Sequence, residues 1–170
     1  MLSVDGLRKK FPIFKSNQEL VYLDSASTTQ KPQVVIDAVN EYYSSYSANV
    51  HRALYEIGDK ATNEYESVRN KVRNFLKVPD THEIIFTSGT TESINLVAYS
   101  WGLNNLNSEK GVLVTEMEHH SNLVPWQIIS QKTSSPLKHI PLNNDGTLEI
   151  SNLESYLNGI GIISLVHQSN

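Results

Sequence analysis

The chain has 170 residues, 39% of them hydrophobic and 19% charged, a composition typical of a globular domain with its own core. Its 14 basic and 18 acidic residues give a formal net charge of −4, and no basic stripe predicts binding to nucleic acid or to an anionic membrane. Cysteine is absent, which excludes disulfides and a thiol nucleophile within the chain and favours a cytoplasmic location. No apolar run is long enough to span a bilayer, and the N-terminus lacks the apolar core of a secretion signal.

The first half of the chain is predicted to hold two amphipathic helices. Residues 1–30 show no period and are expected to be irregular. After Pro32, which suits a first helical turn, apolar residues recur at helical spacing as far as Tyr43. A second pattern of this kind runs from about Asp59 to Leu76.

The second half of the chain alternates strands with helices. Four apolar segments are predicted as strands: "EIIFT" (83–87), "GVLVTE" (111–116), "LKHIPL" (137–142) and "GIGIISLV" (159–166). Helical segments lie between them, and in the last of these Ser151 and Glu154 have the spacing of a capping box. This alternation predicts an α/β fold with a mainly parallel sheet and flanking helices.

The segment "SGTTES" (88–93) leaves the first predicted strand, and ligands of open parallel sheets bind outside the carboxyl ends of the strands. Gly89 permits close backbone approach, Thr90 and Thr91 offer hydroxyls, and the following helix presents unpaired N–H groups. A phosphate site is one interpretation, and a threonine that merely caps the helix is the other. The chain has no P-loop lysine motif and no G-x-G-x-x-G.

The segment "MEHHSN" (117–122) places two adjacent histidines after the second predicted strand. A metal site is not favoured, because adjacent histidines on an extended segment project to opposite sides and no H-x-x-x-H spacing occurs. One exposed and one packed histidine is the structural interpretation. A histidine that stacks on a flat ligand or transfers protons is the functional one.

Six segments in order resemble the cysteine desulfurases of the SufS type, in the class V aminotransferase group of pyridoxal phosphate (PLP) enzymes. They are "YLDSAS", "NVHRAL", "FTSGTTESINLVAYSWG", "MEHHSNLVPWQ", "IPLNNDGTL" and "VHQSN". The similarity covers nearly the whole chain with matching spacing. It implies that residues 21–170 are the N-terminal part of a large PLP-binding domain of fold type I. Residues 1–20 would pack on the small domain or at the site entrance.

The resemblance also implies a cofactor site. Thr90 and Thr91 would bind the PLP phosphate through hydroxyls and backbone N–H groups. His119 would stack on the pyridine ring and help proton transfers, with a packed neighbour in His120. Asn170 would approach the phenolic oxygen of the ring. A planar imidazole against a flat, electron-poor ring gains contact area and holds that ring in place.

On the substrate side, the resemblance implies that Ala26 lines the pocket for L-cysteine and that His51 and Arg52 lie near it, reaching in across a homodimer interface. Taken alone, "VHR" reads more simply as a surface cation beside a capped histidine. The chain has Ala53 and Tyr55 where related sequences often have glycine and histidine, so the resemblance does not define the substrate contacts at these two positions.

The family's PLP-binding lysine, its partner aspartate for the pyridine nitrogen, its carboxylate-binding arginine and its catalytic cysteine would all follow residue 170. The chain alone is therefore expected to be inactive, poorly soluble and weakly cooperative on melting. The function implied is transfer of sulfur from L-cysteine to an acceptor protein of iron–sulfur cluster assembly, with L-alanine as the other product. A selenocysteine lyase, another class V enzyme and a non-catalytic remnant are the alternatives. A further alternative is a metal-dependent hydrolase built on the glutamates and histidines of residues 116–120.

Overall fold

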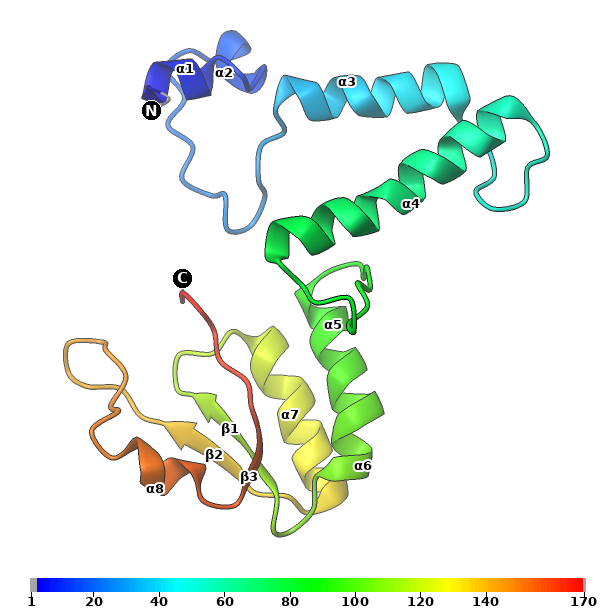
Figure 1. Cartoon of the computed structure of the whole chain (residues 1–170). Coiled ribbons are helices and arrows are strands. Elements are labelled where there is room, and N and C mark those ends of the chain that lie inside the picture. Colours follow the sequence, from blue (N-terminus) through cyan, green and yellow to red (C-terminus); the bar gives the residue numbers. More distant parts are fainter. Residues whose placement is uncertain (1–2, 170) are drawn as a thin grey trace. The chain divides into compact units, whose positions relative to one another are not determined.

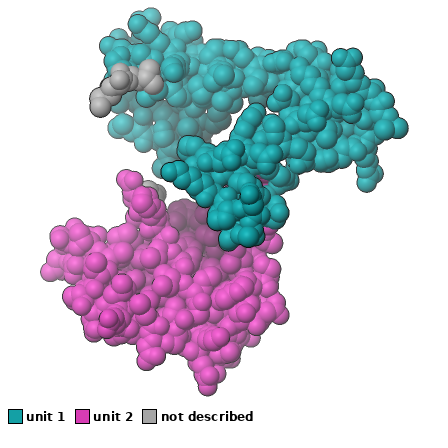
Figure 2. Space-filling model, viewed as in Figure 1, with its two compact units in different colours: residues 1–84 teal, residues 85–170 magenta. Residues whose placement is uncertain are grey.

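The structure is a computed structural model that describes residues 3–169. The chain divides into two compact units, Met1–Ile84 and Ile85–Asn170 (Figure 2). The first unit is helical, and the second contains a three-stranded sheet with helices (Figure 1). The predicted boundary near residue 20 concerns packing against a further domain and stays a prediction. No helix within residues 3–169 combines the length and apolar character that a membrane span requires.

The first unit begins with two short helices, α1 (Val4–Arg8) and α2 (Ile13–Ser16), so the expectation that residues 1–30 are wholly irregular was wrong. The Ser3 hydroxyl caps α1 by accepting the N–H of Gly6 at 3.1 Å. The Arg8 guanidinium lies 4.1 Å from the centre of the Phe14 ring and donates to the carbonyl of Leu20. Helices this short are held by such local contacts and show no period in the sequence.

The two amphipathic helices predicted for this unit are confirmed as α3 (Gln33–Glu41) and α4 (Glu56–Leu76). Pro32 is the N-cap of α3, and the helix continues as a π-helical segment, η1 (Tyr42–Tyr46). The valine and tyrosine side chains of α3, η1 and α4 line an apolar groove of about 660 Å³. The helical spacing of apolar residues therefore identified the groove-lining face, although many of these side chains remain exposed.

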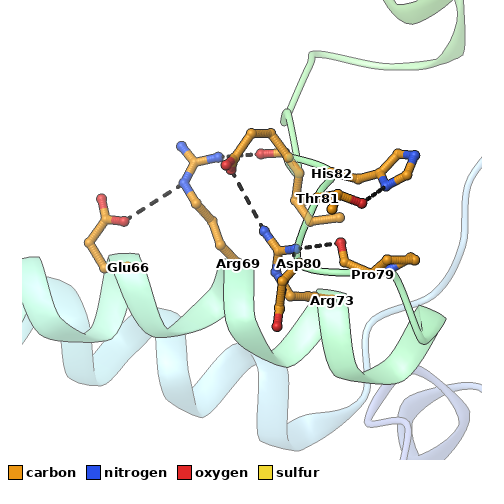
Figure 3. A network of polar contacts seen from close by, with 9 residues as sticks. Glu66, Arg69, Arg73, Pro79, Asp80, Thr81 and His82 are labelled. Carbon is orange, nitrogen blue, oxygen red and sulfur yellow. Dashed lines mark hydrogen bonds and ion pairs between the residues drawn. The ribbon is translucent and has the colours of Figure 1, made fainter.

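Two arginines of α4 hold the segment that follows the helix (Figure 3). The Arg73 Nη1 donates to the carbonyl of Pro79 at 2.9 Å, and the Arg69 Nη1 donates to the carbonyl of Ile84 at 2.6 Å. Arg73 also lies within 3.8 Å of the carboxylates of Asp80 and Glu83. Since guanidinium groups present several donors in a fixed plane, each can satisfy backbone carbonyls that no helix or strand uses.

The second unit contains a parallel sheet in the order β2–β1–β3. The strands are β1 (Gly111–Thr115), β2 (Leu137–Ile140) and β3 (Ile160–Ile163), which confirms three of the four predicted strands. The helices of this unit are α5 (Thr90–Val97), α6 (Leu103–Asn105), α7 (His120–Thr133) and α8 (Leu153–Leu157), and a π-helical segment, η2 (Ala98–Gly102), joins α5 to α6. Every residue of β1 is buried, as a central strand of a covered parallel sheet requires.

The core of this unit lies where α5, η2 and α7 cover one face of β1. Its buried members are Ala98, Leu106, Val112, Val114, Trp126 and Ile129. At the start of β1 the backbone passes very close to the segment before β2. A Cβ on Gly111 would lie 2.3 Å from the carbonyl oxygen of Pro136, so only glycine fits there.

The prediction of a strand at residues 83–87 was wrong. This segment is extended, but it is not part of the three-stranded sheet, and the side chains of Ile85 and Phe86 are 69% and 50% exposed. The apolar run is typical of a buried strand, but a strand also has to pair with another strand, and the sheet described within residues 3–169 pairs β1 with β2 and β3 alone. The last predicted strand forms β3, at one edge of the sheet.

The predicted capping box at Ser151 is also absent. The N-cap of α8 is Asn152, with no side-chain cap, and both the N–H and the hydroxyl of Ser151 donate to the carboxylate of Glu149. An upstream carboxylate two residues away competed successfully for the serine, which the spacing alone did not reveal.

Candidate functional site

A depression of about 390 Å³ opens at the carboxyl edge of the sheet in the second unit. It is lined by the first turn of α5, by the loop between β1 and α7, and by the segment that follows β3, including Thr90, His119, Asn122, Ser164 and His167. Parallel strands end on the same side of a sheet, which is why residues far apart in the sequence meet there.

The N-terminus of α5 presents backbone N–H groups that no side chain caps. Its N-cap is Gly89, with φ of 157°, and a Cβ built on Gly89 would meet no atom within 4 Å. Thr90 and Thr91 are the first two residues of the helix and are exposed, so the alternative that a threonine caps the helix is not supported. A helix N-terminus of this kind attracts an anion through its N–H groups and its dipole.

One carboxylate lies in the same turn. Glu92 accepts the backbone N–H of Ser88 at 2.7 Å and the Ser88 hydroxyl at 2.5 Å. The hydrogen bond from the Ser88 hydroxyl, and then that from its N–H, lowers the pKa of Glu92. The negative charge of Glu92 is therefore stabilised by two hydrogen bonds from Ser88, in the loop that precedes the helix.

His119 is the N-cap of α7. Its Nδ1 accepts the backbone N–H of Ser121 at 3.1 Å and lies 2.9 Å from the Ser121 hydroxyl. Because an imidazole nitrogen that accepts a backbone N–H carries no proton, the neutral ring has its hydrogen on Nε2. The cap therefore fixes both the orientation of the ring and its tautomer.

His120 is exposed and is the first residue of α7, so the expectation of a packed neighbour was wrong. The two imidazole rings are 6.3 Å apart and inclined at 81°. Helix α7 begins between the two residues, so they do not point to opposite sides as adjacent residues of an extended segment would. Within residues 3–169, no group of three or more histidine, aspartate or glutamate side chains is placed to hold a metal ion.

The remaining predicted residues are distributed as follows. Thr91 lines a neighbouring depression of about 340 Å³ that also contacts His119. Asn170 lies outside the described residues. Ala26, His51 and Arg52 belong to the first unit, where all three are exposed.

His51 has a positive φ of 70°, which is uncommon for a residue with a side chain. Its backbone N–H donates to the hydroxyl of Thr62 at 3.0 Å, and its Nε2 lies 3.1 Å from the carboxylate of Glu66. Both partners are on α4, so this helix holds the turn that carries the predicted substrate residue.

Several lining residues were not predicted. His167 lies in the depression with Thr90 and His119, and its position just after β3 is a signal that could have identified it. Glu118, Asn122 and Ser164 form a hydrogen-bonded group beside it. Ser164 is 42 positions from Asn122 in the sequence, so no spacing rule groups it with the other two residues.

The chain belongs to the aminotransferase class-V family, whose family model matches residues 21–170. A probable cysteine desulfurase of Halalkalibacterium halodurans is 44% identical over 99% of this chain and 43% of its own length. A cysteine desulfurase of Synechococcus elongatus is 41% identical over 98% of this chain and 27% of its own length.

Solved structures of cysteine desulfurases are also similar to this chain. The apo structure of the cysteine desulfurase from Thermococcus onnurineus superposes with a TM-score of 0.84 at 35% identity, over all of this chain and 41% of that one. The cysteine desulfurase CsdA of Escherichia coli superposes with a TM-score of 0.78 at 35% identity, over 93% of this chain and 39% of that one. The chain thus spans less than half the length of these relatives, and the comparisons confirm the expected fold class.

Proposed function

We propose that this chain forms part of a PLP-dependent cysteine desulfurase and supplies the phosphate-binding turn and the ring-stacking histidine of its cofactor site. One observation carries the proposal: the first turn of α5, with uncapped N–H groups and Thr90, faces the same depression as His119. The names and the identity of the relatives support cysteine as the substrate.

The residues fit the cofactor in size and in donor chemistry. A depression of about 390 Å³ lies within the range of small-ligand sites. Gly89 adds no side chain above the N–H groups of α5, and the threonine hydroxyls supply further donors for a phosphate. An imidazole whose Nδ1 is already occupied by Ser121 can present its flat face to a ring.

When bound, PLP supplies an electron sink that stabilises negative charge at the substrate α-carbon. The chain's own residues would bind and orient it. Thr90 and Thr91 would hold the phosphate, His119 would hold the ring with a proton available on Nε2, and Asn170 would approach the phenolic oxygen. Ala26, His51 and Arg52 would form part of the substrate pocket.

The finer assignment is proposed on the resemblance alone. We assign the protein to the SufS type, with a sulfur-acceptor protein of iron–sulfur cluster assembly as its partner, in the cytoplasm and as a homodimer. The exposed apolar groove of α3, η1 and α4 supports association with a further protein surface.

Binding by the chain itself can be tested with pyridoxine 5′-phosphate, which has the ring and phosphate of PLP but no aldehyde to react with surface lysines. We expect saturable binding that weakens about tenfold in Thr90→Val and in Thr91→Val, since each loses a hydrogen bond to a charged group. Thr147→Val, which removes an exposed threonine hydroxyl outside the depression, is the matched control. Equal affinity for pyridoxine without phosphate would contradict the assigned phosphate site.

Activity is tested on the complete product of the coding frame that contains this chain. With PLP, L-cysteine and a thiol reductant that releases the enzyme-bound persulfide sulfur as sulfide, we expect L-alanine and sulfide in equal amounts. A clear preference for L-selenocysteine would instead assign the protein as a selenocysteine lyase, and no turnover of either substrate would support a non-catalytic remnant.

A further inference from the structure

A single carboxylate beside the depression joins the end of β1, the first turn of α7 and the segment after β3. The Oε1 of Glu118 accepts the hydroxyl of Thr115 at 2.6 Å, at the end of β1, and the N–H of Val166 at 3.0 Å, in the segment after β3. Its Oε2 accepts the amide Nδ2 of Asn122 at 2.7 Å, in the first turn of α7. The residue immediately after it is His119.

The direction of every hydrogen bond in this group is determined. The indole N–H of Trp126 can only donate, and it donates to the Oδ1 of Asn122 at 3.2 Å, so the Nδ2 of Asn122 must face Glu118. The Ser164 hydroxyl donates to the same Oδ1 at 2.5 Å. Asn122 is buried, so a donor without an acceptor would carry a full desolvation cost.

Glu118 is thus required as an acceptor that has no hydrogen of its own to donate. A glutamine of the same shape would turn an N–H₂ group toward the N–H₂ of Asn122 or toward the N–H of Val166. Either orientation brings two donors together and opens one side of the depression.

We propose that Glu118 is a positioning residue of the cofactor site, which fixes the loop that carries His119 against the segment Ser164–His167. This role rests on the proposed function for its purpose, but the geometry can be tested without a cofactor. A second contact between the same two segments supports it, since the Ser169 hydroxyl donates to the carbonyl of Met117 at 3.0 Å.

The test is a cycle of Glu118→Gln, Asn122→Asp and the double variant in the whole chain. In Glu118→Gln the new amide N–H₂ lies opposite the N–H₂ of Asn122, and in Asn122→Asp two carboxylates lie opposite each other. The double variant restores one donor, on residue 118, opposite one acceptor, on residue 122. Amide hydrogen exchange is measured for the peptides that cover residues 116–122, 164–169 and β1. Glu116→Gln is the matched control, because Glu116 is in the same loop but accepts the N–H of Leu142 instead.

We expect each single variant to accelerate exchange at residues 164–169 about tenfold, with residues 111–114 of β1 unchanged, and the double variant to recover most of the protection. The defect of Asn122→Asp should also shrink in acid, because one shared proton rejoins two carboxylates. Equal acceleration in β1 would reduce Glu118 to a general stabilising residue, and a double variant worse than both singles would overturn the proposal. Should Glu118→Gln fail to fold, the milder Ser164→Ala tests the same contact between the loop that carries His119 and the segment Ser164–His167, which we call the Glu118 junction.

Affinity for pyridoxine 5′-phosphate provides the functional readout. It should fall in each single variant and recover in the double variant. Absence of binding by the unmodified chain would count against the proposed function, while the exchange cycle would still decide the positioning role. If the double variant recovered protection from exchange but not affinity for pyridoxine 5′-phosphate, the Glu118 junction would not position the site.

Discussion

His119 has two separable roles, a helix cap and a ring surface, and substitution can divide them. His119→Ala removes the Nδ1 acceptor that the Ser121 N–H uses at 3.1 Å, and loss of a side-chain N-cap typically costs about 1 kcal/mol. Asparagine is among the best N-cap residues, so His119→Asn should keep most of that stability while removing the imidazole.

The expected result is a free energy of unfolding about 1 kcal/mol lower in His119→Ala, and within about 0.5 kcal/mol of the unmodified chain in His119→Asn. For a unit of this size, 1 kcal/mol corresponds to roughly 4–8 °C in Tm. Urea titration at constant pH, followed by circular dichroism, measures it.

Ligand affinity should not follow the order of stability of the two His119 variants. Pyridoxine 5′-phosphate should bind weakly to both variants, because both lack the flat ring. If His119→Asn were as destabilised as His119→Ala, the capping argument would be refuted. If His119→Asn bound the ligand as well as the unmodified chain does, the ring would not contact it.

Three further predictions follow from the fold. Gly111→Ala should destabilise the second unit by about 2 kcal/mol or more, since its Cβ would lie 2.3 Å from the Pro136 oxygen; thermal melting measures this, and a near-neutral effect would contradict the close approach. Ile129→Ala, at a fully buried position, should cost about 2–5 kcal/mol, and a loss below 1 kcal/mol would mean that the α7 packing is looser than described. The lowered pKa of Glu92 contributes stability above its ordinary value of 4.5 that disappears as pH falls through the folded-state pKa, so Ser88→Ala should reduce the loss of Tm between pH 6 and pH 3.

Periodicity and the alternation of strands with helices predicted most of the fold. The helical patterns gave α3, α4 and α7, and the apolar runs gave the three strands, because both signals record which face is buried. The position of His119 after a predicted strand correctly placed it at the carboxyl edge of the sheet. Thr90 lines the same depression, but residues 83–87, which precede its turn, do not form the strand on which its placement depended.

The failures share a physical cause, which is dependence on a partner that local sequence does not specify. The run at residues 83–87 has the composition of a strand but no neighbour in the described sheet. Ser151 had the spacing of a cap but is bound by Glu149. The Glu118 junction joins residues brought together only when β1 and β3 pair, and no short-range pattern anticipates it.

The central place of β1 has a consequence for the order of folding during synthesis. Both of its neighbours, β2 and β3, lie later in the chain, so β1 leaves the ribosome before either partner exists. At ordinary rates of translation, β3 follows after on the order of several seconds. During that interval one whole side of the most deeply buried strand has no partner, and self-association through that side competes directly with the arrival of β3.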